Sequence, residues 1–119
     1  MSPLVIENRS RNFDVKVDAA ARAWLDSHPA RASRVISYAV KRCCGGGKIC
    51  MVQVREASRR DDLSRHTPVA LDDGIQLLVD PRAAARLPAR FGLTVRGLGP
   101  LKHLDLVLDG EQWGNLLYD

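Results

Sequence analysis

Hydrophobic and polar residues alternate along several short stretches of the chain, and this two-residue period is typical of β-strands. The stretches are separated by turn residues such as Asp72-Asp73-Gly74, a strong hairpin sequence. We therefore expect six or seven short strands. The stretches with this pattern are residues 13–17, 34–41, 49–55, 69–71, 75–79, 92–96 and 104–108.

Two segments carry a helical pattern instead. Apolar residues recur at helical spacing between Val17 and Leu25, Asp18 is suited to cap the helix, and Pro29 follows as a stop. This predicts a helix over residues 19–28, with Trp24 as a core anchor. Asp80 before Pro81 predicts a second short helix over 81–87. After a turn at 109–110, residues 113–118 are expected to pack back onto the domain.

These elements predict a mostly β, α+β fold with two short helices. The 119 residues are 45% hydrophobic and 27% charged, which is typical of a globular protein, and we expect one domain over 1–119. Residues 1–12 contain no continuous apolar stretch after a basic start, so no export signal is visible. No apolar run approaches the ~20 residues of a membrane helix. We expect a cytoplasmic protein without a membrane partner.

The net charge of +4 raises the question of nucleic acid, but the chain has only two each of Phe, Trp and Tyr. Its densest basic cluster begins at the end of the expected strand over 49–55 and continues into the expected loop over 56–68, where acidic residues interrupt it. A solvated loop is the better interpretation, and we expect no nucleic-acid partner. The cluster consists of Arg55, Arg59, Arg60 and Arg65, interrupted by Glu56, Asp61 and Asp62.

The most unusual chemistry is the run Cys43-Cys44-Gly45-Gly46-Gly47, at the tip of the hairpin expected over 34–55. Three successive glycines favour a backbone with unusual dihedrals. Arg42 and Lys48 flank the run and should favour thiolate over thiol. A disulfide between adjacent cysteines is strained and easily reduced, because their Cα atoms are only ~3.8 Å apart. Cys43 and Cys44 are therefore candidate metal ligands or redox thiols rather than a structural disulfide.

The other candidate ligands are less informative. Cys50 shares a strand face with Val52 and Val54, so we expect it in the core. His28, His66 and His103 are expected at the surface, and only His103, close to a Gly-rich turn, merits a metal titration. No Cys-x-x-Cys pair supports a structural zinc site, and no motif places a base beside a thiol. We expect a binding protein rather than an enzyme.

With this order of elements, the chain resembles the HesB-like family of A-type iron–sulfur carriers. The matching parts are residues 17–21, residues 35–45, and the run from Asp73-Gly74-Ile75 to Val79-Asp80-Pro81, within residues 13–97. The Cys-Cys pair before glycines is more similar to the small HesB-related proteins with a Cys-Cys or Cys-selenocysteine motif. The resemblance implies a compact domain of two small sheets and two helices that binds iron or an iron–sulfur cluster.

In this resemblance Cys43 or Cys44 stands where the family has its first cluster ligand. The family's Cys-Gly-Cys near the C-terminus has no counterpart, because residues 51–119 contain no cysteine. A homodimer would supply four thiolates, the ligand number of a [2Fe–2S] cluster. The family implies an apo-protein or a cluster-assembly protein as partner. The alternatives left open are a thiol–disulfide redox protein using the same pair, and a relative that retains only the fold.

Overall fold

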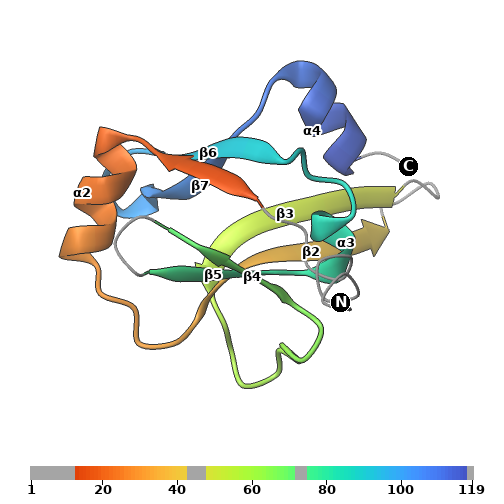
Figure 1. Ribbon diagram of the computed structural model, residues 1–119, viewed down its shortest axis with the longest axis horizontal. Helices are drawn as coiled ribbons and strands as arrows, with labels where there is room; N and C mark the ends of the chain where they lie inside the picture. The colour runs from red at the N-terminus through yellow and green to blue at the C-terminus, as the bar shows by residue number, and fades with distance from the viewer. Residues whose placement is uncertain (1–12, 43–47, 72–74, 118–119) are drawn as a thin grey trace, which may run out of the picture.

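The computed structural model describes residues 13–42, 48–71 and 75–117. Strands predominate, with three α-helices and one 3₁₀ turn among these residues (Figure 1). The elements, in chain order, are β1 (Asp14–Val17), α2 (Ala19–Ser27), β2 (Arg34–Arg42), β3 (Lys48–Glu56), β4 (Thr67–Ala70), β5 (Gln76–Val79), α3 (Pro81–Ala84), β6 (Arg90–Arg96), η1 (Gly99–Leu101), β7 (His103–Val107) and α4 (Gly110–Leu117).

The strands form two small sheets. The first has three strands in the order β1-β6-β7, and the second has four in the order β3-β2-β5-β4. Both expected hairpins are present, because β2 pairs with β3 and β4 with β5 in antiparallel register. Two parallel pairings, β1 with β6 and β2 with β5, join strands that are distant in sequence. The expected α+β fold with two small sheets is confirmed.

The first helix begins as expected. The carboxylate of Asp18 accepts a hydrogen bond from the Ala21 backbone N–H at 2.8 Å, which satisfies one of the unpaired donors at the start of α2. Ala21 and Leu25 face the core, and Trp24 packs against it half-buried. The helix ends at Ser27, and the ring of Trp24 stacks on that of His28 at 3.7 Å.

The second helix is shorter than its expected range of 81–87. The Asp80 carboxylate accepts a hydrogen bond from the Arg82 backbone N–H at 2.8 Å, and Pro81 occupies the first turn. Regular α-helix then stops at Ala84, and the chain passes through turns before Pro88. Ala83 and Leu87 are still buried, so the segment packs as expected although only its first turn is regular helix.

The third helix, α4, was not among the two expected from the sequence. Two of its eight residues are glycines, which lower the helix propensity of the segment. Its start is a reciprocal capping box, in which Gln112 N–H donates to the Asp109 carboxylate at 2.8 Å and Asp109 N–H donates to the Gln112 side-chain oxygen at 3.0 Å. Leu116 is fully buried, so this segment packs back onto the domain as predicted.

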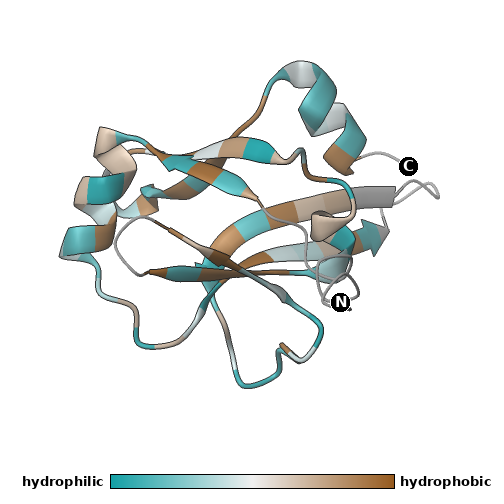
Figure 2. Cartoon of the chain, viewed as in Figure 1, coloured by the Kyte–Doolittle hydropathy of each residue, from teal (hydrophilic) through white to brown (hydrophobic). Residues whose placement is uncertain are grey.

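One continuous core lies between the two sheets and the helices. Hydrophobic residues alternate with polar ones along the strands (Figure 2), and the inward members are almost completely buried. Pro68, expected in a loop, instead pairs opposite Leu78 in β4, where an edge strand tolerates its missing N–H. The largest fully buried side chains are Ile36, Leu77, Leu87, Leu93, Leu106, Leu116, Val35 and Val79.

Candidate functional site at the tip of the β2–β3 hairpin

The β2–β3 ladder is continuous along both strands. It runs from the pair Arg34–Glu56 to the pair Arg42–Lys48, so the connection consists of residues 43–47. Cys43 and Cys44, the site residues predicted from the sequence, lie in this connection and outside the described residues, as do the side chains of Arg42 and Lys48. The expected hairpin is confirmed, and its ladder assigns both thiols to one short connection.

One face of this hairpin belongs to the core. Residues opposite each other in the ladder share a face, so Ile36, Tyr38 and Val40 lie on the same side as Cys50, Val52 and Val54. Cys50 is half-buried and packs against the core cluster, and it forms no disulfide. Cys50 lies two ladder pairs from Arg42–Lys48, the last pair before the connection.

A hydrogen bond joins the two strands beside this end. The hydroxyl of Tyr38 donates to the sulfur of Cys50 at 3.2 Å, and the Tyr38 side chain is almost completely buried. The guanidinium groups of Arg82 and Arg86 lie 5.1 and 5.5 Å from the centre of the Tyr38 ring, within range of a cation–π interaction. The sequence analysis did not single out any of these three residues beside Cys50.

Arg82 ties this cluster to the start of α3. Its guanidinium donates to the backbone carbonyl of Tyr38 at 2.6 Å and forms a salt bridge with Asp80 at 3.3 Å. Asp80 N–H in turn donates to the carbonyl of Ile36. The helix cap and the ring contact thus hold α3 against β2, on the strand that leads to the candidate thiols.

The described residues offer no metal site of their own. Within residues 13–42, 48–71 and 75–117, no group of three or more His, Cys, Asp or Glu side chains could hold a metal ion. His28 and His103 are exposed, as expected, and lie on separate elements. His66 was expected at the surface, but it is half-buried, and its Nδ1 has no hydrogen-bond partner among the described atoms.

The charged loop after β3 is held in place by an ion pair and by its own hydrogen bonds. Arg55 binds both carboxylate oxygens of Asp61, at 2.8 and 2.9 Å, and the Ser58 backbone N–H donates to the same carboxylate. The Arg55 hydrogen bonds, followed by that of Ser58, hold the pKa of Asp61 well below its usual range. The side-chain hydrogen bond of Ser64 is the main cause that lowers the pKa of Asp62. Of the acids that interrupt the basic cluster, Asp61 is therefore a direct partner of one of its arginines, Arg55.

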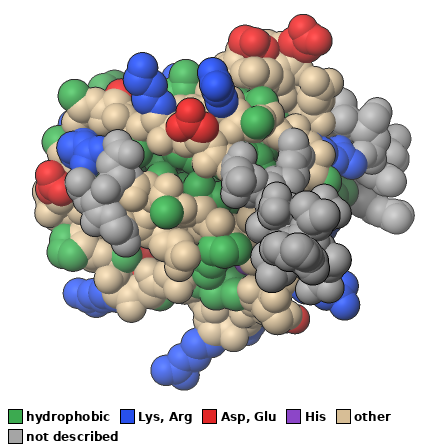
Figure 3. All heavy atoms as spheres, viewed as in Figure 1, with side chains coloured by type: hydrophobic (Ala, Val, Ile, Leu, Met, Phe, Trp, Pro, Cys, Tyr) green, Lys and Arg blue, Asp and Glu red, His purple; other side chains and the backbone are tan. Residues whose placement is uncertain are grey.

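Basic side chains do not gather on the face of the molecule seen in Figure 3. Lys and Arg are spread over it, with acidic side chains between them. No helix in the described part of the chain is long and apolar enough to cross a membrane.

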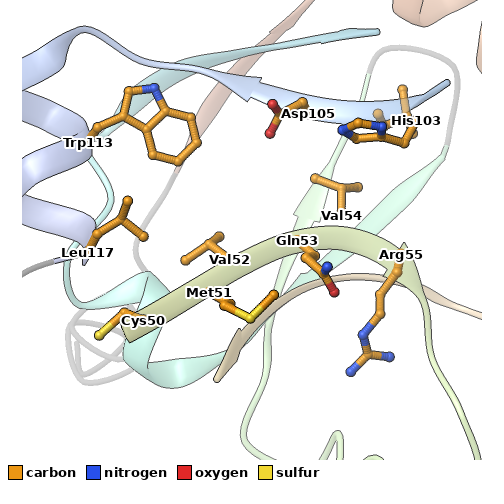
Figure 4. Close-up of a pocket in the computed structure, with 11 residues that line it drawn as sticks. Cys50, Met51, Val52, Gln53, Val54, Arg55, His103, Asp105, Trp113 and Leu117 are labelled. Atoms are coloured by element: carbon orange, nitrogen blue, oxygen red, sulfur yellow. The ribbon is translucent and has the colours of Figure 1, made fainter. Parts of the chain in front are cut away.

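A groove, here called the edge groove, begins beside Cys50. It has a volume of about 560 Å³ and runs between β3 and β7, each the outermost described strand of its sheet. Figure 4 shows Val52 and Val54 rising from β3 toward Asp105, with Trp113 and Leu117 at one end and His103 at the other. It is lined by residues 50–55 of β3, residues 103–105 of β7, and Trp113 and Leu117 of α4.

Comparison of the chain with protein-family models, with curated proteins and with solved structures found no match.

Proposed function

We propose that this protein binds an iron–sulfur cluster or iron through Cys43 and Cys44, as a HesB-like relative of the iron–sulfur cluster assembly carriers. One observation carries the proposal: the β2–β3 ladder is unbroken as far as Arg42 and Lys48, which confines the two thiols to the five residues 43–47. Adjacent thiols at a hairpin end, beside two cationic residues, suit metal binding better than a structural role.

The donor set fits this class of group. Thiolates are the ligands that iron–sulfur clusters and other soft metal centres prefer. The proposed ligands are the thiols of Cys43 and Cys44. Two copies of the chain would provide four thiolates, and we propose a homodimer for the cluster-bound protein, with an apo-protein or a cluster-assembly protein as its partner.

Anaerobic reconstitution with iron and sulfide tests the proposal. We expect visible absorption that is lost in Cys43→Ser and in Cys44→Ser but retained in Cys50→Ser, the matched control. Cys50 is the suitable control because its sulfur already accepts the Tyr38 hydrogen bond within the ladder. A colourless wild-type protein with freely titratable thiols would contradict the proposal.

The same thiols support one other function, thiol–disulfide exchange. Adjacent cysteines form a strained disulfide that is readily reduced, which suits a transient redox bond. Mass spectrometry of the oxidised protein separates the two functions. A reducible bond between Cys43 and Cys44, in a protein that takes up neither iron nor sulfide, would replace the carrier proposal with this one.

A further inference from the structure

Two leucines project from the turn between β6 and β7. The side chains of Leu98 and Leu101 are 83% and 75% exposed, against 47% and 45% for Val40 and Val107, the other large hydrophobics exposed in the described part of the chain. We call residues 97–102 the leucine turn. Isolated exposed hydrophobics are common, but two neighbouring leucines in one short turn form an apolar projection.

The leucine turn has a defined backbone. Leu101 N–H donates to the Leu98 carbonyl at 3.0 Å, and Lys102 N–H donates to the Gly99 carbonyl at 3.2 Å. Gly97 and Gly99 have φ of +93° and +57°, which favour glycine. Because these bonds and dihedrals fix the turn, its leucines cannot easily fold back onto their own domain.

The same molecule carries an apolar groove of suitable size. The edge groove has Val52, Val54 and Leu104 as apolar lining, with Trp113 and Leu117 at its end. Its volume is about 560 Å³, and a cavity of ~150 Å³ already holds benzene, so two leucine side chains fit.

The leucine turn and the edge groove are neighbours, with His103 between them. His103 lines the groove, and its Nδ1 lies 2.8 Å from the carbonyl oxygen of Leu101. Because the leucine turn and the edge groove lie side by side, two copies of the chain can be related by a two-fold axis near His103. Each copy then places its leucine turn in the edge groove of the other. Such a contact is self-complementary and closes as a dimer rather than growing into a filament.

The groove is lined by two side chains of opposite charge, Arg55, which is paired with Asp61, and Asp105. Lys102 is exposed directly after Leu101, whereas the carboxylate of Asp105 lies in the wall of the groove. Asp105 is held there by Arg96 at 2.9 Å and keeps 23% of its side chain exposed. A leucine turn entering the groove of a second copy would bring Lys102 toward this carboxylate.

We propose that the protein forms a two-fold dimer in which the leucine turn of each copy occupies the edge groove of the other. This dimer needs neither metal nor disulfide, and its surfaces share no residue with the proposed thiol site. Its occupant is a second copy of the chain, because the chain itself exposes the apolar projection and the cation that suit the groove.

Sedimentation equilibrium of the full chain tests the proposal. The Cys43→Ser/Cys44→Ser variant, metal-free and reduced, excludes any dimer held by a cluster or by those thiols. We expect this protein to dimerise between ~1 µM and ~1 mM. Leu98→Asp/Leu101→Asp should weaken the dimer about tenfold or more, because it removes the apolar contact at both copies of the interface. Val40→Asp, which introduces the same kind of charge at an exposed valine of β2 outside both the leucine turn and the edge groove, should leave the dimer unchanged.

A second readout reports on the groove. In a Trp24→Phe background the fluorescence comes from Trp113, the other tryptophan of the chain, which lies in the groove. We expect its emission to shift to shorter wavelength with protein concentration, and not to shift in Leu98→Asp/Leu101→Asp. A monomer throughout the concentration range would overturn the proposal. So would a dimer that forms without changing Trp113 emission or that survives loss of both leucines. Reconstitution of the cysteine-containing protein remains an independent test of the proposed function.

Discussion

The hydroxyl of Tyr38 donates a hydrogen bond to the sulfur of Cys50 across β2 and β3, at 3.2 Å. The two residues occupy diagonal positions of the ladder, since Tyr38 pairs with Val52 and Cys50 pairs with Val40. The Cys50 end of this bond lies two ladder pairs before Arg42–Lys48, the last pair of the hairpin. It gives the sulfur of Cys50 a hydrogen-bond partner inside the fold.

Replacement of Tyr38 by Phe tests that bond. The substitution keeps the ring that Arg82 and Arg86 contact but removes the donor to Cys50. Because sulfur is a weak acceptor, we expect a loss of only about 0.5 kcal/mol in the free energy of unfolding. Cys50 should react faster with a thiol reagent in the Cys43→Ser/Cys44→Ser background. An unchanged rate of reaction would show that the hydroxyl does not protect the sulfur.

The Arg55–Asp61 pair predicts a pH dependence. The folded-state pKa of Asp61 is lowered, so its stabilising contribution is present above the unfolded pKa of about 3.9 and is lost as the pH falls through the folded pKa. Asp61→Asn should therefore lower the urea midpoint at pH 7, and its difference from the wild type should shrink below about pH 4. Asp26→Asn, on the exposed side of α2, is the control and should change little at pH 7. A difference that stayed constant down to pH 2.5 would contradict the assignment.

Gly97 and Gly99 offer a matched pair of substitutions in the leucine turn. A Cβ at Gly97 would lie 2.3 Å from the Leu101 carbonyl oxygen, whereas a Cβ at Gly99 meets nothing within 4 Å. Both have positive φ, so Gly99→Ala should cost about 1 kcal/mol from backbone strain alone. Gly97→Ala adds the clash and should cost about 2 kcal/mol or more. Urea unfolding measures both, and equal costs would mean that the turn adjusts to relieve the clash.

Gly114 in the middle of α4 predicts a gain in stability. A Cβ there meets nothing within 4 Å, and glycine inside a helix is less favourable than alanine. Gly114→Ala should raise the free energy of unfolding by about 0.5–1 kcal/mol. Gly110→Ala, at the first position of the same helix, is the comparison and should have a smaller effect. Thermal unfolding followed by circular dichroism measures both effects. A lowered unfolding midpoint for Gly114→Ala would contradict the free space found around a Cβ at this position.

The elements could be read from the sequence where local chemistry specifies them. Asp18 and Asp80 cap the helices that follow them, and the alternating residues of β2 and β3 face the core as expected. The helix at the C-terminus was missed because Gly110 and Gly114 weaken its propensity. Its sequence marker was nevertheless present, since Asp109 and Gln112 have the spacing of a capping box.

The surroundings of the candidate site could not be read in the same way. Arg82 contacts Tyr38 although 44 residues separate them, and Trp113 and Val52 line one groove from different elements. No local pattern carries that information, because it depends on the parallel pairing of β2 with β5 and on the packing of the two sheets. Hydrophobic alternation specifies which face of a strand is buried, but not which strand lies beside it.

The sequence by itself determined the strand faces, two of the helix starts and the hairpin over β2 and β3. These follow from interactions within a few residues, such as side-chain caps, turns and two-residue alternation. Only the tertiary structure decided that β3 and β7 are neighbouring edges, that a groove lies between them, and that the leucine turn stands beside it. Those relationships depend on contacts between distant segments, whose geometry is settled when the sheets pack around a common core.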